Sequence, residues 1–489
     1  MAYEVHQELT VLFDKLLGAE SRLLYKQIGR KLPHTIRFNP LKGDIKDQQA
    51  LFLEQGFRFK PLEEREDIFQ MTFQPYPIGR SLSHFLGHIY VQDIASMIPA
   101  LVLNPQPGDW VLDMSAAPGS KTTLMAAMME NRGVILANDV VRKRLKALGK
   151  NIERMSLCNT LLYKWYGEQF GNTFFECFDK VLLDPACSGL GTLHKNPEIL
   201  SWWTPAHCER LADSQKNLLI SAVKTLKPGG ELVYSTCTLT PVENEEIIDF
   251  ALNEFPLEVE EIALPGIKTW PGLDGFDGKP FHPDLAKTIR LYPIDRITEG
   301  FYVAKLRKTG STKAPRQERQ KEISHIPFIS YRTSPVKKYL DYLCKTFEIP
   351  AAVFKDYVYL MQKDIVFTRK DILDFPVYGA PLQIGLPLAR PMDYGAKLNT
   401  GGCHLFGHLA GKRVVELPDL STLEKFANRQ PLDIFPQESG QYIVKYKNCM
   451  IGYGIVDEGR LKSQFPRGDW PFRLTGEWNG EEGEEAGAG

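Results

Sequence analysis

The chain lacks the features that mark membrane, secreted and strongly charged proteins. No apolar run approaches the roughly 18 residues that a transmembrane helix requires, and Met1 to His6 contain neither the cationic nor the apolar region of a signal peptide. The 59 lysines and arginines are balanced by 60 acidic residues, so the formal net charge is -1. This balance excludes a basic surface over the whole protein, but not a local basic face. We expect a cytoplasmic protein.

Paired cysteines are also absent. The eight cysteines include no CxxC motif, so we expect no disulfide framework, no zinc site and no other metal. We further expect a monomer. Most of the cysteines are expected to be small buried hydrophobes; these are Cys158, Cys177, Cys208, Cys344, Cys403 and Cys449. Cys187 and Cys237 are treated separately below because of their positions.

Length and composition predict several globular domains. A chain of 489 residues, 43% hydrophobic and 24% charged, is long enough for roughly three of them. The pattern along the chain predicts an N-terminal α+β extension at 1–85, an α/β domain at 86–306, a basic linker at 307–325, a β-rich C-terminal region at 326–475 and a disordered tail at 476–489.

Strands and helices alternate between residues 88 and 306. We expect strands at 110–114, 134–137, 159–165, 180–184 and 231–236, and helices at 121–129, 141–155 and 209–226. Such an alternation predicts a parallel sheet with helices on both faces. In sheets of this kind, ligands bind beyond the carboxyl ends of the strands.

The flanking regions have patterns of their own. Residues 1–75 predict two helical stretches and a mixed segment, and the chain after the linker predicts a helical segment to about 372. Beyond it, glycine-punctuated stretches at 441–446 and 451–454 are typical of strands. The linker carries one acid, Glu318, against the cations Arg307, Lys308, Lys313, Arg316, Arg319 and Lys321.

A run of small residues joins the first strand to its helix, in the order Ser115-Ala116-Ala117-Pro118-Gly119-Ser120-Lys121. Small side chains let a ligand approach the backbone, and the helix start offers free N–H donors. Asp139 ends the next strand at a spacing that suits the two hydroxyls of a ribose. The run lacks GxGxxG and the P-loop pattern. A nucleoside cofactor without phosphates, such as S-adenosylmethionine, therefore fits; the alternative is a tight turn beside an already satisfied Asp139.

Two cysteines follow strands that should be neighbours. Cys187 lies in Asp184-Pro185-Ala186-Cys187-Ser188-Gly189, and Cys237 in Ser235-Thr236-Cys237-Thr238. Cytosine C5 reacts poorly with a methyl sulfonium unless a thiolate first adds to C6 and makes the ring an enamine. A base must then remove the C5 proton, and an acid near N3 and N4, for which Asp184 is placed, would stabilise the adduct. Each cysteine alone suggests a core residue; together, beside the cofactor loop, they suggest this chemistry.

The segments Ser115 to Lys121, Asp184 to Gly189 and Ser235 to Thr238 resemble motifs of the NOL1/NOP2/Sun family of RNA 5-methylcytosine methyltransferases. The resemblance implies a Rossmann-like class I methyltransferase sheet that uses S-adenosylmethionine. It implies that Cys237 attacks the base and that Cys187 assists product release. Two positions depart from the family pattern: Ala186 stands where a proline is usual, and Tyr166 where an Asp usually contacts the adenine.

Resemblances outside the catalytic motifs concern the RNA. Arg37 to Lys42 is similar to the family's N-terminal RNA-contacting motif, and Gly452 to Lys462 resembles a PUA-like RNA-binding module. A PUA-like module behind such a catalytic domain is similar to the family members that methylate a decoding-region cytosine of 16S rRNA, cytosine 1407, on the small ribosomal subunit. A plain structural role for this β-rich segment remains the alternative.

Several readings remain open from the residues alone. The helix after Asp139 has a basic face of Arg142, Lys143, Arg144, Lys146 and Lys150, which we expect to be solvated rather than bound to phosphate. The linker cations, with Arg37 and Lys42, are the better candidates for RNA contact. Alternatives for the whole protein are the same chemistry on another rRNA or a tRNA, an amino-group methyltransferase, reversed roles of the two cysteines, and a non-catalytic ribosome-assembly factor.

Overall fold

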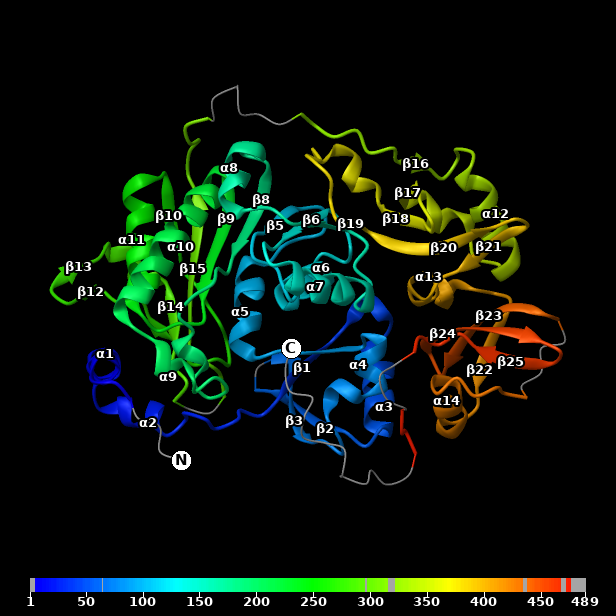
Figure 1. Cartoon of the computed structure of the whole chain (residues 1–489), viewed down its shortest axis with the longest axis horizontal. Helices are drawn as coiled ribbons and strands as arrows, with labels where there is room; N and C mark the ends of the chain where they lie inside the picture. Colours follow the sequence, from blue (N-terminus) through cyan, green and yellow to red (C-terminus); the bar gives the residue numbers. More distant parts are fainter. Residues whose placement is uncertain are drawn as a thin grey trace.

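The computed structural model describes residues 5–63, 65–294, 297–314, 322–433, 438–467 and 472–475. A long sheet with helices on both faces forms its centre (Figure 1). In the same view the N-terminal elements lie below this sheet and the C-terminal elements to its right. Among the described residues no helix combines the length and the apolar character needed to cross a membrane.

The central sheet has ten strands. Five are parallel: β5 (Trp110–Asp113), β6 (Val134–Asn138), β7 (Thr160–Tyr163), β8 (Phe178–Leu183) and β9 (Leu226–Thr236). The others pair antiparallel: β15 (Phe301–Lys308), β14 (Ile289–Leu291), β11 (Trp270–Pro271), β10 (Leu257–Glu260) and β19 (Gln383–Ile384). The parallel order β7-β6-β5-β8-β9 reverses at β5, which creates a crevice at the strands' carboxyl ends. The predicted α/β sheet is confirmed.

Helices cover both faces of this sheet, because each strand is apolar on both sides. One face packs against α5 (Ile94–Leu103), α6 (Ser120–Met128) and α7 (Arg142–Arg154). The other packs against α8 (Phe170–Thr173), α10 (Pro205–Thr225) and α11 (Glu245–Glu254). The short helix α9 (Ile199–Trp202) lies in a separate core with α1 (Gln7–Leu17).

The N-terminal region is built around a second, four-stranded sheet in the order β2-β3-β1-β4. Its elements are α2 (Ser21–Tyr25), β1 (Thr35–Phe38), α3 (Ile45–Glu54), β2 (Arg58–Leu62), β3 (Arg65–Phe73), α4 (Leu82–Leu86) and β4 (Ile89–Val91). Stacked aromatic rings form its core; Phe52 and Phe57 have ring centroids 4.3 Å apart. The expected two helices and mixed segment are therefore present.

The C-terminal region contains two sheets. The first, in the order β16-β17-β18-β20-β21, comprises β16 (Ile329–Ser330), β17 (Tyr357–Met361), β18 (Ile365–Arg369), β20 (Leu386–Met392) and β21 (Gly395–Leu398), with α12 (Val336–Phe347) and α13 (Thr400–Phe406). The second comprises β22 (Val414–Leu417), β23 (Gly440–Tyr446), β24 (Cys449–Asp457) and β25 (Arg460–Ser463), with α14 (Leu420–Ala427). The strands predicted at 441–446 and 451–454 are confirmed.

Two expectations about the chain after residue 300 are wrong. The helical segment expected to about 372 ends at Phe347, and the hairpin of β17 and β18 follows, because its aromatic and β-branched residues favour a strand and are buried on both of its faces. The first linker cations belong to β15 instead: Arg307 binds Glu231 and Glu260, and Lys308 is buried beside Glu176. Arg316, Glu318, Arg319, Lys321 and the expected tail at 476–489 lie outside the described residues.

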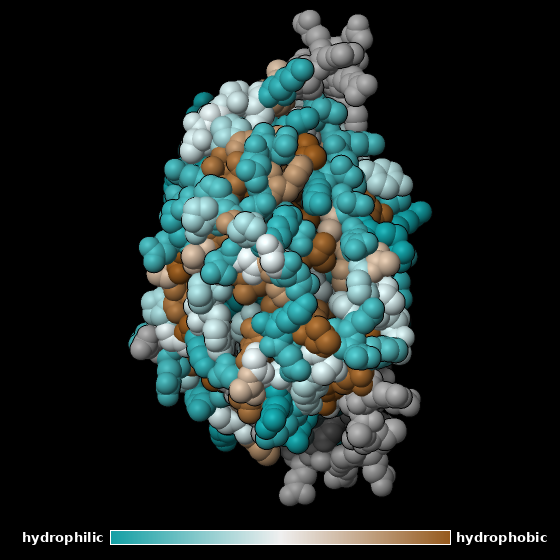
Figure 2. Space-filling model, turned by 90° about the vertical axis from the view of Figure 1, so that its left-hand side faces the viewer, coloured by the Kyte–Doolittle hydropathy of each residue, from teal (hydrophilic) through white to brown (hydrophobic). Residues whose placement is uncertain are grey.

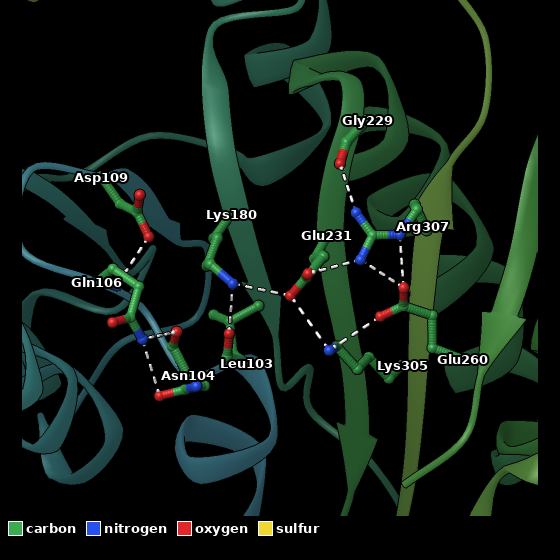
Figure 3. A network of polar contacts seen from close by, with 10 residues as sticks. All are labelled: Leu103, Asn104, Gln106, Asp109, Lys180, Gly229, Glu231, Glu260, Lys305 and Arg307. Atoms are coloured by element: carbon green, nitrogen blue, oxygen red, sulfur yellow. Dashed lines mark hydrogen bonds and ion pairs between the residues drawn. The ribbon is translucent and has the colours of Figure 1, made fainter.

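A network of charges joins four strands at the end of the sheet opposite the crevice (Figure 3). Glu231 of β9 lies 2.8 Å from Lys180 of β8 and 3.3 Å from Lys305 of β15. Glu260 of β10 binds Lys305 at 2.9 Å, and Lys180 also donates to the carbonyl of Leu103 at the end of α5. Such partly exposed pairs contribute about 1 kcal/mol or less each. Their effect is to favour one register of β8, β9 and β15.

The surface beside α1, α11 and the β12–β13 hairpin (Gly275–Phe276 and Lys279–Pro280) faces the viewer in Figure 2. It is mainly hydrophilic, with small apolar spots between the polar residues. Scattered apolar side chains of this kind are normal on a protein surface. Sheets with this topology bind ligands in the crevice at the carboxyl ends of the parallel strands, which lies away from this face.

Candidate active site

A pocket of about 730 Å³ opens at the carboxyl ends of β5, β8 and β9. Its lining brings together the residues that the sequence placed in three separate motifs. From the small-residue loop come Ser115, Ala116, Ala117, Pro118, Ser120 and Lys121, and from the strand ends come Asp184, Cys187 and Cys237. Side chains from β4, α5 and β15 complete the wall.

Cys187 and Cys237 face each other across neighbouring strands. The parallel register pairs Leu183 with Tyr234, so the segments that follow β8 and β9 leave the sheet at the same edge. The two Sγ atoms lie 3.3 Å apart, and both thiols are half-buried. The hydrogen bond with Cys237, followed by burial, raises the pKa of Cys187 well above its ordinary value. Cys187 therefore stays a protonated thiol beside Cys237.

A buried carboxylate fixes the loop that carries Cys187. Glu243 accepts hydrogen bonds from the Ser188 backbone at 2.9 Å and from Thr240 Oγ1 at 2.7 Å. The Gln215 side chain donates both to Glu243 and to the Ala186 carbonyl, at 3.1 and 2.9 Å. Ala186 is therefore held through its backbone, without the proline that is usual there. Sequence reasoning missed Glu243 and Gln215, because both lie among other polar residues and have no local signal that marks them.

Lys121 and Asp184 form an ion pair inside the pocket, with Nζ and Oδ2 2.7 Å apart. Ser235 Oγ donates to the other carboxylate oxygen of Asp184 at 2.9 Å. Burial alone would lower the pKa of Lys121, but the Asp184 carboxylate raises it above its ordinary value. The ammonium therefore stays charged, and the pair presents both a cation and an anion beside the thiols.

The small-residue loop has the shape of a ligand cradle. Gly119 adopts a φ of +108°, and a Cβ there would lie 2.8 Å from Leu148 Cδ1, so only glycine fits. Asp113, at the end of β5, is buried beside the loop, and burial raises its pKa to about 7. The backbone N–H groups at the start of α6 follow the loop directly.

Asp139 lies next to the pocket rather than on its wall. One carboxylate oxygen accepts the N–H of Val141 at 2.8 Å. The other is buried, accepts no hydrogen bond and lies 3.2 Å from Arg144 Nη1, and Arg144 does line the pocket. A buried carboxylate oxygen that is paired with an arginine but accepts no hydrogen bond from the described residues fits a ligand hydroxyl. Tyr166, by contrast, is 67% exposed and does not line the pocket.

Two residues expected to contact RNA are buried instead. The Arg37 guanidinium lies 4.8 Å from the centre of the Tyr90 ring and donates to Thr123 Oγ1 of α6 at 2.6 Å. Lys42 is 7% exposed, and its Nζ lies 2.7 Å from Nδ1 of His404. The expectation that Arg37 and Lys42 bind RNA is therefore wrong. Arg37 supports the start of α6 behind the loop.

A cluster of charged side chains that the sequence did not predict also borders the pocket. Asp93 and Glu299 lie together with His194, with candidate ligand atoms within 4.8 Å of one another. Lys195 Nζ is 2.5 Å from Glu299 Oε2, so an ammonium already supplies positive charge here. Burial, reinforced by Glu299, raises the pKa of Asp93 to about 7.

Comparison with known proteins gives consistent neighbours. The family described as 16S rRNA methyltransferase RsmB/F matches residues 100–307. Ribosomal RNA small subunit methyltransferase F of Shewanella sp. (strain MR-7) is 31% identical, over 90% of this chain and 91% of that protein. A tRNA (cytosine(49)-C(5))-methyltransferase of Pyrococcus abyssi is 39% identical, over 62% of this chain and 97% of that protein. The crystal structure of a methyltransferase homolog from Pyrococcus horikoshii is 34% identical with a TM-score of 0.56, over 62% of this chain and 95% of that chain.

The thiol pair leads to a testable difference in reactivity. At pH 8 to 9 we expect iodoacetamide to alkylate Cys187 slowly, because its raised pKa keeps it protonated and only the thiolate reacts. Cys237→Ala removes the first cause of that raised pKa and should accelerate the alkylation of Cys187 several-fold, as measured by peptide mass spectrometry. The half-buried Cys344 is the internal control and should react equally in both proteins. An unchanged rate at Cys187 would contradict the coupling of the two thiols.

Proposed function

Because the chain belongs to the 16S rRNA methyltransferase RsmB/F family, we propose that it transfers a methyl group from S-adenosylmethionine to C5 of a cytosine in 16S rRNA through a covalent adduct with Cys237. The chain is a methyltransferase, and the proposal concerns its substrate, mechanism and site residues. The observation that carries it is the approach of Cys187 and Cys237 to 3.3 Å beside the Lys121–Asp184 pair. Two thiols suit a reaction with an addition and an elimination step.

In this mechanism Cys237 is the nucleophile. Its sulfur, as the thiolate, bonds to C6 of the cytosine, and the electron pair of the C5–C6 double bond moves to the C4–C5 bond. The ring is then an enamine, and C5 is nucleophilic. When bound, S-adenosylmethionine supplies the methyl group as a sulfonium. Asp184 and Lys121 face the base edge, where a carboxyl and an ammonium can hold N4, N3 and O2. The charge that develops on the ring is thereby stabilised.

Cys187 serves the second half of the reaction. The C5 proton must leave so that the bond between Cys237 and C6 can break and restore the aromatic ring. The first cause of the raised pKa of Cys187 is its hydrogen bond with Cys237. That hydrogen bond is lost once the Cys237 sulfur is bonded to carbon, so the pKa of Cys187 falls and a larger fraction of it is the thiolate that can accept the C5 proton.

Residues of the small-residue loop and Asp139 suit the cofactor. The buried oxygen of Asp139 that lies beside Arg144 can accept a ribose hydroxyl, and the loop from Ser115 to Lys121 leaves room for a nucleoside against the backbone. We assign Tyr166 no more than a backbone contact, since its side chain points to solvent.

Relatives with the whole architecture favour 16S rRNA as the substrate. The relatives named ribosomal RNA small subunit methyltransferase F match 90% of this chain, and the tRNA enzyme matches 62%. The matched length therefore includes most of the region that we propose to be an RNA-binding, PUA-like part at 326–475, beyond a catalytic domain at 86–306 and an extension at 1–85. Within 16S rRNA the proposed target is cytosine 1407, on the small ribosomal subunit.

The roles of the two cysteines predict opposite phenotypes. Cys237→Ala should abolish methyl transfer and form no covalent RNA complex, because no sulfur adds to C6. Cys187→Ala should still add and methylate, but elimination should stall, so that an RNA adduct survives denaturing gel electrophoresis. Cys344→Ala, distant from the pocket, is the matched control and should behave as the unsubstituted protein. An adduct with Cys237→Ala and none with Cys187→Ala would reverse the two roles.

The assignment of Asp139 predicts weaker cofactor binding in its variants. Asp139→Ala should lower the affinity for S-adenosylmethionine about 10- to 100-fold in titration calorimetry, as expected for a lost hydrogen bond to a charged group of about 1.5–3 kcal/mol. Asp139→Asn keeps an acceptor for Val141 and should lose less. Unchanged affinity in the alanine variant would remove Asp139 from the site.

The target is checked by bisulfite sequencing, in which 5-methylcytosine resists deamination. In a strain that lacks this gene, we expect one 16S rRNA cytosine, at position 1407, to lose its protection, while tRNA cytosines keep theirs. Purified protein should restore the mark in RNA from that strain. Loss of protection in tRNA instead would shift the substrate to the class named for the Pyrococcus abyssi relative.

A further inference from the structure

A second pocket, of about 580 Å³, lies where the catalytic, N-terminal and C-terminal parts meet. It has no role in the chemistry described above. Five elements supply most of its wall: α4, α7, α13, β20 and β24. The side chains that matter below are Lys150, Arg154, Thr400, His404 and Tyr453. A cavity of this size can hold a nucleoside.

Helix α7 carries a stripe of unpaired lysines toward this pocket. Lys143, Lys146 and Lys150 follow at helical spacing, so they project from one side of α7. All three are exposed, and none of them forms an ion pair with any residue that the structure describes. An exposed stripe of cations without acidic partners is the electrostatic pattern that attracts a polyanion.

The same helix connects the second pocket with the active site. Arg144 lines the active-site pocket and Lys150 lines the second one, about 9 Å further along the helix at 1.5 Å per residue. The two pockets also share a wall: the Arg154 guanidinium, in the second pocket, lies 5.3 Å from the centre of the Tyr90 ring, in the first. A strand leaving the active site can therefore follow α7 directly.

The interior of the second pocket suits an uncharged ring better than a phosphate. Lys150, Arg154 and Arg390 are offset by Glu153 and by Asp364, which binds Arg390 at 2.8 Å. Tyr453 offers a half-buried aromatic ring.

His404 places a buried ring nitrogen at the wall of this pocket. Its Nδ1 lies 2.7 Å from Lys42 Nζ, which leaves Nε2 as the ring nitrogen on the other side. The Thr400 hydroxyl has no partner among the described residues.

We propose that this second pocket binds the base of an unpaired nucleotide near the target cytosine, with the connecting RNA backbone held along α7 by Lys143, Lys146 and Lys150. The inference rests on the proposed function, since it assumes that the target base occupies the active site. Base stacking on Tyr453 and polar contacts with His404 and the Thr400 hydroxyl would hold the second base. A flipped-out target costs a few kcal/mol, and binding a second nucleotide offsets part of that cost.

The lysine stripe is tested by charge reversal. K146E/K150E should weaken binding of a 16S rRNA fragment about ten-fold or more in fluorescence anisotropy. It should also lower the slope of log affinity against log salt by about 1.4, two contacts at about 0.7 each. K216E/K224E on α10, against the opposite face of the sheet, is the matched control and should change neither quantity. Equal losses in both variants, or none in K146E/K150E, would overturn the role of α7.

The pocket itself is tested by filling it. Thr400→Trp removes no hydrogen bond that the structure contains but occupies the cavity, and it should weaken RNA binding while the affinity for S-adenosylmethionine stays unchanged. In the unsubstituted protein, 4-thiouridine beside the target should cross-link to the peptide that contains Tyr453. Normal RNA affinity of Thr400→Trp together with cross-links only elsewhere would refute the pocket. Both readouts are independent of methyl transfer, so they can succeed even if the proposed reaction fails.

Discussion

The parallel pairing of β8 with β9 is the constraint on which the candidate site depends. Because of this pairing, the segments that follow β8 and β9 leave the sheet at the same edge. Cys187 and Cys237 are fifty residues apart in sequence, yet their Sγ atoms lie 3.3 Å apart. A shift of the register by one residue would turn every side chain of one strand to the other face and separate the thiols. The register is held from both ends: the Glu231 network joins the strands at their far ends (Figure 3), and Glu243 fixes the loop after β8.

Charge inside the pocket is arranged in pairs rather than as single buried ions. Lys121 with Asp184, and Lys195 with Glu299, each combine an ammonium with a carboxylate. A single buried charge would have a large desolvation free energy, and the attraction within a pair offsets part of it. When a polar base enters the pocket, contacts with the base can replace part of that attraction. The thiols are the exception, since the proposed reaction requires one of them to lose a proton. Their mutual hydrogen bond raises the pKa of Cys187 and so distinguishes the two thiols.

The parts of this protein that could be predicted from sequence follow local rules. The loop Ser115 to Lys121, the parallel strands and the two cysteines at strand ends depend on short-range pattern and on the geometry of parallel sheets, and the structure has them where expected. The prediction that Arg37 contacts RNA was wrong because its burial depends on contacts with Tyr90 and Thr123, which lie far away in sequence. The prediction of a helix at residues 357–369 was wrong because a helix and a hairpin of these residues differ in which side chains meet the core. The pairing of β18 with β20, a strand further along the chain, favours the hairpin. Glu243 and Gln215 gave no local signal, since their partners are backbone groups of another loop.

The C-terminal region is joined to the catalytic sheet by more than a linker. Strand β19, from residues 383–384, pairs with β7 and becomes the edge of the central sheet itself. Thr368 Oγ1 donates to the Cys158 carbonyl at 2.8 Å, and Asp371 accepts the N–H of Gly133 at 2.7 Å. These contacts fix the distance between the active site and the elements that follow β19, including α13 and β24. If both pockets bind nucleotides as proposed, this arrangement selects RNA by the spacing of its unpaired nucleotides, since the substrate must reach both pockets at once. Pre-organisation of this kind lowers the entropy lost on binding, and under the proposed function it makes the fold of the C-terminal region a determinant of which cytosine is methylated.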